Sequence, residues 1–123
     1  MAEHFRDRPL ASITADDVES MRHLGETLFV ELKAGGEDPD SNNYRLAQAV
    51  AAFANTLGGW LLLGLDADGQ HVTPTPAWIA DAGPRLVDAI RDRIRGHLDP
   101  LPAFEARTFT LPGGPVGVVR VYE

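Results

Sequence analysis

Arginines gathered in one stretch are the residues of this chain best suited to contact phosphates. The four that matter are Arg85, Arg91, Arg93 and Arg95. Arg91 and Arg95 stand four residues apart and therefore share one face of a predicted helix. Arginine neutralises backbone phosphates, so the stretch predicts a local nucleic-acid-binding patch. Asp88 and Asp92 leave a second interpretation open, in which this face is only a solvated surface of ion pairs.

Charge and composition narrow the classes of function. The chain has 123 residues, a formal net charge of −7, 44% apolar residues and no cysteine. The acidic charge disfavours tight nonspecific nucleic-acid binding, so any contact should be local. Without cysteine, disulfides and thiolate metal sites are excluded, and a cytoplasmic location is predicted. No apolar run is long enough to span a membrane, and the N-terminus lacks the apolar core of a signal peptide.

Three other chemical patterns are rejected. Gly58 and Gly59 follow a predicted helix, and a helix C-terminus has the wrong polarity for a phosphate loop. The spacing of a calcium loop is missing from the acidic residues Glu37, Asp38 and Asp40. Metal-ligand spacing is also missing from the histidines, which we expect at the surface: His4, His23, His71 and His97.

The elements that must position these residues are organised around the stretch 49–66. Its first part is an alanine-rich helix end, stopped by the two glycines, and its second part is an apolar strand buried on both faces. The apolar periodicity predicts two main helices, 44–58 and 84–98. It predicts strands at 28–33, 60–66, 104–111 and 116–122, with a hairpin between the last two.

A shorter helix is predicted before the first strand. Thr14 and Asp17 form a capping-box pattern at its start, and Gly25 ends it. The order is therefore α-β-α-β-α-β-β. This order predicts an α+β fold with a mixed sheet of about four strands and both main helices packed on it, leaving the opposite face or an edge for a partner.

One domain is predicted over residues 13–123, preceded by an N-terminal arm over residues 1–12. The arm is polar, and its Phe5 lies between His4 and Arg6, so we expect this side chain to be exposed.

Several motifs in this order resemble the Schlafen-type AlbA domain of bacterial regulators and Schlafen proteins. The resemblance covers about residues 20–122 and rests on Glu26 followed by Glu31-Leu32-Lys33, on Ala52-Phe53-Ala54-Asn55-Thr56-Leu57-Gly58-Gly59, and on Trp60-Leu61-Leu62-Leu63-Gly64-Leu65-Asp66 with Asp68-Gly69. It implies an Alba-like fold and a nucleic-acid-binding domain of a transcriptional or defence regulator. The family often continues past the last strand, so we expect a longer protein. The cysteine-built zinc site of Schlafen proteins is impossible here.

The resemblance also implies a catalytic alternative. Glu26, Glu31 and Asp66 correspond by motif to three carboxylates with which certain Schlafen proteins cut RNA. Such carboxylates hold Mg²⁺ or Mn²⁺, and Lys33 would stabilise the charge of the phosphate. In the structural alternative, Glu31 and Lys33 form an ion pair along a sheet face and Asp66 begins a turn.

The role of Asn55 has two interpretations, and the overall function has three. We expect the Asn55 amide to tie the glycine turn to a neighbouring loop, with ligand binding as its second interpretation.

The leading functional hypothesis is nucleic-acid binding to DNA or RNA. The others are a metal-dependent endoribonuclease and a protein-interaction module, which would include a homodimer.

Overall fold

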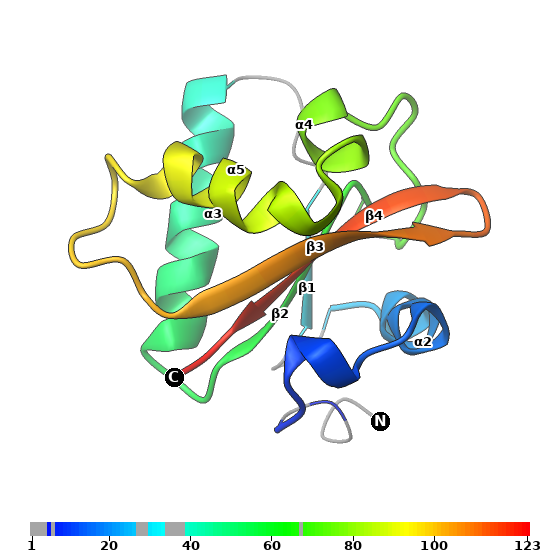
Figure 1. Cartoon of the computed structure of the whole chain (residues 1–123), viewed down its shortest axis with the longest axis horizontal. Helices are drawn as coiled ribbons and strands as arrows, with labels where there is room; N and C mark the ends of the chain where they lie inside the picture. Colours follow the sequence, from blue (N-terminus) through cyan, green and yellow to red (C-terminus); the bar gives the residue numbers. More distant parts are fainter. Residues whose placement is uncertain (1–4, 6, 27–29, 34–38, 67) are drawn as a thin grey trace.

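One mixed sheet forms the centre of the protein. The computed structural model describes residues 5, 7–26, 30–33, 39–66 and 68–123. Within these residues, four strands lie in the order β1-β2-β4-β3 (Figure 1): β1 (Val30–Lys33), β2 (Gly59–Leu63), β3 (Phe104–Leu111) and β4 (Gly114–Val121). The first pair is parallel and the others are antiparallel. The α+β class is confirmed.

The central strand β2 is buried on both faces, as its apolar run predicts. Successive side chains of a strand point to opposite faces. Leu61 and Leu63 therefore join one apolar cluster, while Trp60 and Leu62 join another. Three helices cover the first face (Figure 1): α3 (Pro39–Ala54), α4 (Ala77–Ala80) and α5 (Leu86–Ile94).

The second face is covered as well, so the prediction of a free opposite face is wrong. The segment before β1 lies over it (Figure 1), with the 3₁₀ helix η1 (Leu10–Ser12) and the helix α2 (Ala15–Leu24). The side chains of this segment in the second cluster are those of Phe5, Leu10, Ile13, Val18 and Met21.

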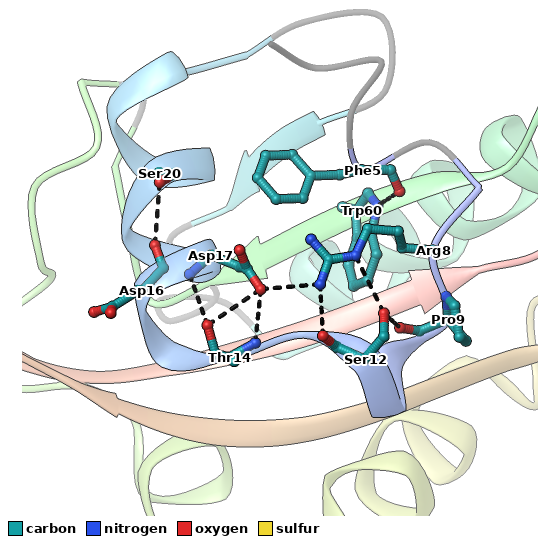
Figure 2. A network of polar contacts seen from close by, with 9 residues as sticks. All are labelled: Phe5, Arg8, Pro9, Ser12, Thr14, Asp16, Asp17, Ser20 and Trp60. Atoms are coloured by element: carbon teal, nitrogen blue, oxygen red, sulfur yellow. Dashed lines mark hydrogen bonds and ion pairs between the residues drawn. The ribbon is translucent and has the colours of Figure 1, made fainter.

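Two hydrogen bonds fix the start of this segment to the sheet. The Trp60 indole N–H donates to the carbonyl of Phe5 at 2.9 Å (Figure 2), and the Arg120 Nε–H donates to the carbonyl of Arg8 at 2.7 Å. Phe5 is 3% exposed, so the expectation of an exposed side chain there is also wrong.

The helix bounds differ from the predicted ones at their ends. α3 begins at Pro39, a residue that a first turn tolerates, and it ends at Ala54. The N–H groups of Thr56 and Gly58 both donate to the Phe53 carbonyl, which closes the helix before 58. α5 is preceded by a 3₁₀ turn, η2 (Gly83–Arg85), and is shorter than predicted. The short α4 was not predicted.

The predicted capping box and hairpin are confirmed, whereas β2 and β4 have other bounds than the predicted 60–66 and 116–122. Thr14 and Asp17 form a complete capping box at α2. Leu111 pairs with Gly114 across the predicted hairpin. β2 ends at Leu63 rather than at Asp66, because Gly64 turns the chain with a φ of 92°. No helix among the described residues is long and apolar enough to cross a membrane.

Candidate nucleic-acid interface

Two arginines lie on the outer side of α5. Arg91 and Arg95 are separated by one helical turn, with exposed side-chain fractions of 42% and 66%. Arg91 pairs with Asp88 and Arg95 pairs with Asp92, each at 3.2 Å. Both acids are themselves exposed, so these pairs are accessible to solvent and to a competing anion.

Arg93 and Arg85 have different surroundings. The guanidinium carbon of Arg93 lies 4.0 Å from the centroid of the Trp78 ring, and its Nη1 donates to Asn43 Oδ1 at 3.3 Å. Burial lowers the pKa of Arg93. This side chain therefore connects α5 to α4 and α3. Arg85 is exposed and lies in η2, before α5 begins.

Asp66 organises the turn after β2. Its Oδ1 accepts the backbone N–H groups of Asp68 and Gln70 at 2.9 and 3.0 Å, as expected of an aspartate in a turn. The same turn is attached to α2, because Arg22 Nε donates to the carbonyl of Gly69 at 2.8 Å. The structural role considered for Asp66 is confirmed, and its carboxylate is exposed.

The other predicted catalytic residues are placed only in part. Glu26 is exposed, just after α2. Glu31 and Lys33 lie on β1, opposite Leu61 and Leu63 of the parallel β2, and their side chains are outside the described residues. Among the side chains that are described, no three of His, Asp or Glu gather into a metal site. A shared metal at Glu26, Glu31 and Asp66 stays a prediction.

One histidine departs from the expectation of surface histidines. His71 is half-buried, and its ring lies against the hairpin glycines Gly113 and Gly114. Arg22 Nη1 lies 3.1 Å from His71 Nε2, and arginine can only donate, so Nε2 is the acceptor. His71 Nδ1 is buried and has no hydrogen-bond partner among the described residues.

A surface pocket of about 460 Å³ lies between the end of α3 and the segment that joins α5 to β3. Its polar lining includes Asn55, Asp99 and Tyr122, and Pro100 and Pro102 contribute apolar walls. The Asn55 side chain has no hydrogen-bond partner among the described residues, so the expected tie to a loop is not observed. Sequence reasoning singled out Asn55 but missed Asp99 and Tyr122, which no local pattern marks.

Comparisons with known proteins agree with this architecture. No curated protein sequence matches the chain. Among solved structures, it is similar to the DIP2311 protein from Corynebacterium diphtheriae, with a TM-score of 0.55 and 22% identity. The match covers 85% of this chain and 24% of that one, so the chain spans about a quarter of that protein, and the likeness shows the fold alone. Residues 26–123 match the family model described as Schlafen, AlbA_2. The chain therefore belongs to the Schlafen AlbA_2 family, whose domains are associated with nucleic acids.

Proposed function

We propose that this domain binds nucleic acid as part of a longer bacterial transcriptional or defence regulator, with Arg91 and Arg95 as its main phosphate contacts. The observation that carries the proposal is the position of these two arginines, exposed and one turn apart on a helix of a nucleic-acid-associated family. Arg85, exposed in η2 before the start of α5, would add a further positive charge. Arg93 packs on the Trp78 ring and donates a hydrogen bond to Asn43, and these contacts attach α5 to α4 and α3.

The acidic neighbours of these arginines do not prevent phosphate binding. An exposed ion pair contributes at most about 1 kcal/mol, because water screens it and both side chains lose freedom. A backbone phosphate carries one negative charge, as the carboxylate does, but its binding also releases condensed counterions from the nucleic acid, which an intramolecular ion pair does not. Arg91 and Arg95 can therefore exchange Asp88 and Asp92 for adjacent phosphates.

The net charge of −7 makes the contact local. Most of the surface repels a polyanion, so affinity depends on a small number of arginines and falls with salt. Each lost phosphate contact lowers the log–log salt slope by about 0.9 for duplex DNA or about 0.7 for a single strand.

The test is a binding titration at several salt concentrations. Arg91→Ala with Arg95→Ala should weaken binding to all sequences and reduce the salt slope by about 1.4 to 1.8. Arg45→Ala with Arg107→Ala is the matched control, because it removes the same charge from exposed positions on α3 and β3. Equal effects of the two double variants would contradict a contact through α5. Absence of binding by the parent domain would favour the protein-interaction module.

A metal-dependent endoribonuclease is the second candidate. The observation that favours it is the parallel pairing of β1, which carries Glu31 and Lys33, with β2, which leads into the exposed Asp66. Carboxyl ends of parallel strands meet at one edge of a sheet, where oxygen ligands can hold Mg²⁺ or Mn²⁺. A bound ion would activate water there, with Glu26 as a further ligand.

Cleavage of a labelled RNA with and without Mn²⁺ tests this candidate. Asp66→Asn keeps an oxygen that accepts from Asp68 and Gln70, so the turn is retained while the charge is lost. The variant should abolish Mn²⁺-dependent cleavage, whereas Asp68→Asn, an exposed neighbour, should not. No cleavage by the parent domain, or equal cleavage by Asp66→Asn, would remove the candidate.

A further inference from the structure

We infer that the pocket between α3 and the 98–103 segment holds one unpaired base of a single-stranded nucleic acid, and that it prefers bases carrying an amino group. This inference rests on the proposed function and names its ligand class. The pocket volume of about 460 Å³ lies within the about 300–1,000 Å³ that small-ligand sites have.

The lining of the pocket has the chemistry of base recognition. Leu98, Leu101 and the prolines supply apolar walls, and Tyr122 supplies an aromatic ring. Glu105 accepts a hydrogen bond from the Tyr122 hydroxyl, and the Arg120 guanidinium carbon lies 4.7 Å from the ring centroid. The ring is therefore held in place before a ligand arrives, which lowers the entropy that binding would cost. Unpaired bases stack on such rings.

Two polar groups, the Asn55 amide and the Asp99 carboxylate, would read the edge of the base, and the exposed Glu123 adds a second carboxylate to the lining. The Asn55 side-chain amide can donate and accept hydrogen bonds, and no described residue forms a hydrogen bond with it. The exposed carboxylate of Asp99 can only accept, so it suits an exocyclic amino group. Cytosine, adenine and guanine carry such a group. Thymine and uracil offer only the N3–H as a donor, and the two carbonyl oxygens that flank it are repelled by a carboxylate. The carboxylate also repels a phosphate, so the pocket takes the base and not the backbone.

The two phosphate-directed arginines lie near the ends of the segment that lines this pocket, Arg95 in the sequence and Arg91 in space. Arg95 comes three residues before Leu98, at the end of α5. The Arg91 guanidinium carbon lies 5.9 Å from the ring centroid of Phe104, which directly follows the lining residue Ala103. We therefore expect a strand whose phosphates contact these arginines to reach the pocket with one of its bases. The base inside must be unpaired, because its hydrogen-bonding edge would face Asn55 and Asp99.

The experiment measures fluorescence anisotropy with labelled homopolymers, oligo(dC), oligo(dA) and oligo(dT), of equal length at one salt concentration. The parent domain should bind oligo(dC) and oligo(dA) about tenfold more tightly than oligo(dT), the discrimination that one good base contact provides. Asp99→Asn and Asn55→Ala should each remove the preference, so that the variant binds the three homopolymers with equal affinity. Asp16→Asn is the charge-matched control on α2, across the sheet, and should keep the preference.

The outcomes separate this inference from the proposed function. Failure of the parent domain to bind any strand defeats both. Binding without base preference, or a preference that Asp99→Asn leaves intact, defeats the pocket alone. Both pocket residues are exposed, so these variants should fold, and circular dichroism checks this. A second readout is the NMR signal of the Asn55 side-chain amide, which should shift with cytidine more than with uridine. Equal shifts would overturn the base preference.

Discussion

At the scale of single residues, the paired glycines after α3 are explained by packing. Gly58 has a φ of 79°, which favours glycine, and a Cβ there would lie 2.6 Å from the Val121 carbonyl oxygen. A Cβ on Gly59 would lie 2.3 Å from the Phe53 ring. The motif therefore lets the end of α3 lie directly on β2 and β4, and it holds Asn55 at the pocket.

Substitution of Gly59 tests this packing. Gly59→Ala should lower the free energy of unfolding by about 1–3 kcal/mol, because the new methyl group overlaps the Phe53 ring. Gly96→Ala is the control, since a Cβ there meets nothing within 4 Å. Urea unfolding measures both. Equal stability of the two variants would contradict the close approach of Phe53 to Gly59.

At the scale of elements, one carboxylate joins α2 to the segment before it. Asp17 Oδ2 accepts from the Thr14 backbone N–H at 3.0 Å and from Arg8 Nη2 at 3.2 Å (Figure 2). Arg8 Nη2 also donates to the carbonyl of Ser12 at 2.6 Å. The hydrogen bond from the Thr14 N–H is the main reason why the pKa of Asp17 lies below its ordinary value of 3.8. α2 and the N-terminal segment are therefore stabilised together.

This network predicts acid sensitivity at α2. Because folding lowers the pKa of Asp17, its contribution is complete above the unfolded value of 3.8 and is lost as pH falls through the folded value. Below pH 3.8 the parent should therefore lose stability more steeply than Asp17→Asn. Asp16→Asn, whose carboxylate makes none of these contacts, should behave like the parent. Unfolding curves at several pH values measure this, and parallel curves for parent and Asp17→Asn would contradict it.

At the scale of the whole molecule, the sheet has an apolar cluster on each face, and the second depends on residues outside the family match. The match begins at residue 26, yet Phe5, Leu10, Ile13, Val18 and Met21 all belong to that cluster. The folding unit therefore extends at least to Phe5. This segment also covers the sheet face that the sequence suggests for a partner, so the proposed contact through Arg91 and Arg95 lies on the other side of the sheet.

Truncation of one buried ring tests this dependence. Phe5→Ala should lower the free energy of unfolding by about 3–5 kcal/mol, because it opens a cavity against the sheet. That is a large part of the about 5–15 kcal/mol typical of a domain. Leu57→Ala is the control, since Leu57 is 44% exposed and should change stability little. Thermal or urea unfolding gives both values. Similar losses would show that the segment contributes little to the core.

Local patterns in the sequence were sufficient for much of this fold. The apolar run of β2 predicts its burial on both faces, because successive side chains of a strand alternate between the faces and all four from Trp60 to Leu63 are apolar. The capping box at Thr14 and the hairpin at Pro112-Gly113 are also local, since their partners are only a few residues apart. The family was recognisable for the same reason, because its motifs are continuous in the chain.

Only the tertiary structure decided the contacts between distant residues. Phe5 lies in a polar stretch in which apolar residues do not recur at regular spacing. Its hydrogen-bond partner Trp60 is 55 positions away. Arg93 and Arg95 are the same residue type and have similar neighbours in the sequence. Arg93 nevertheless contacts Asn43, 50 positions away, while Arg95 lies at the surface. The pocket joins three segments that no single pattern connects. Such contacts depend on how helices and strands pack, and periodicity within one element carries no information about that packing.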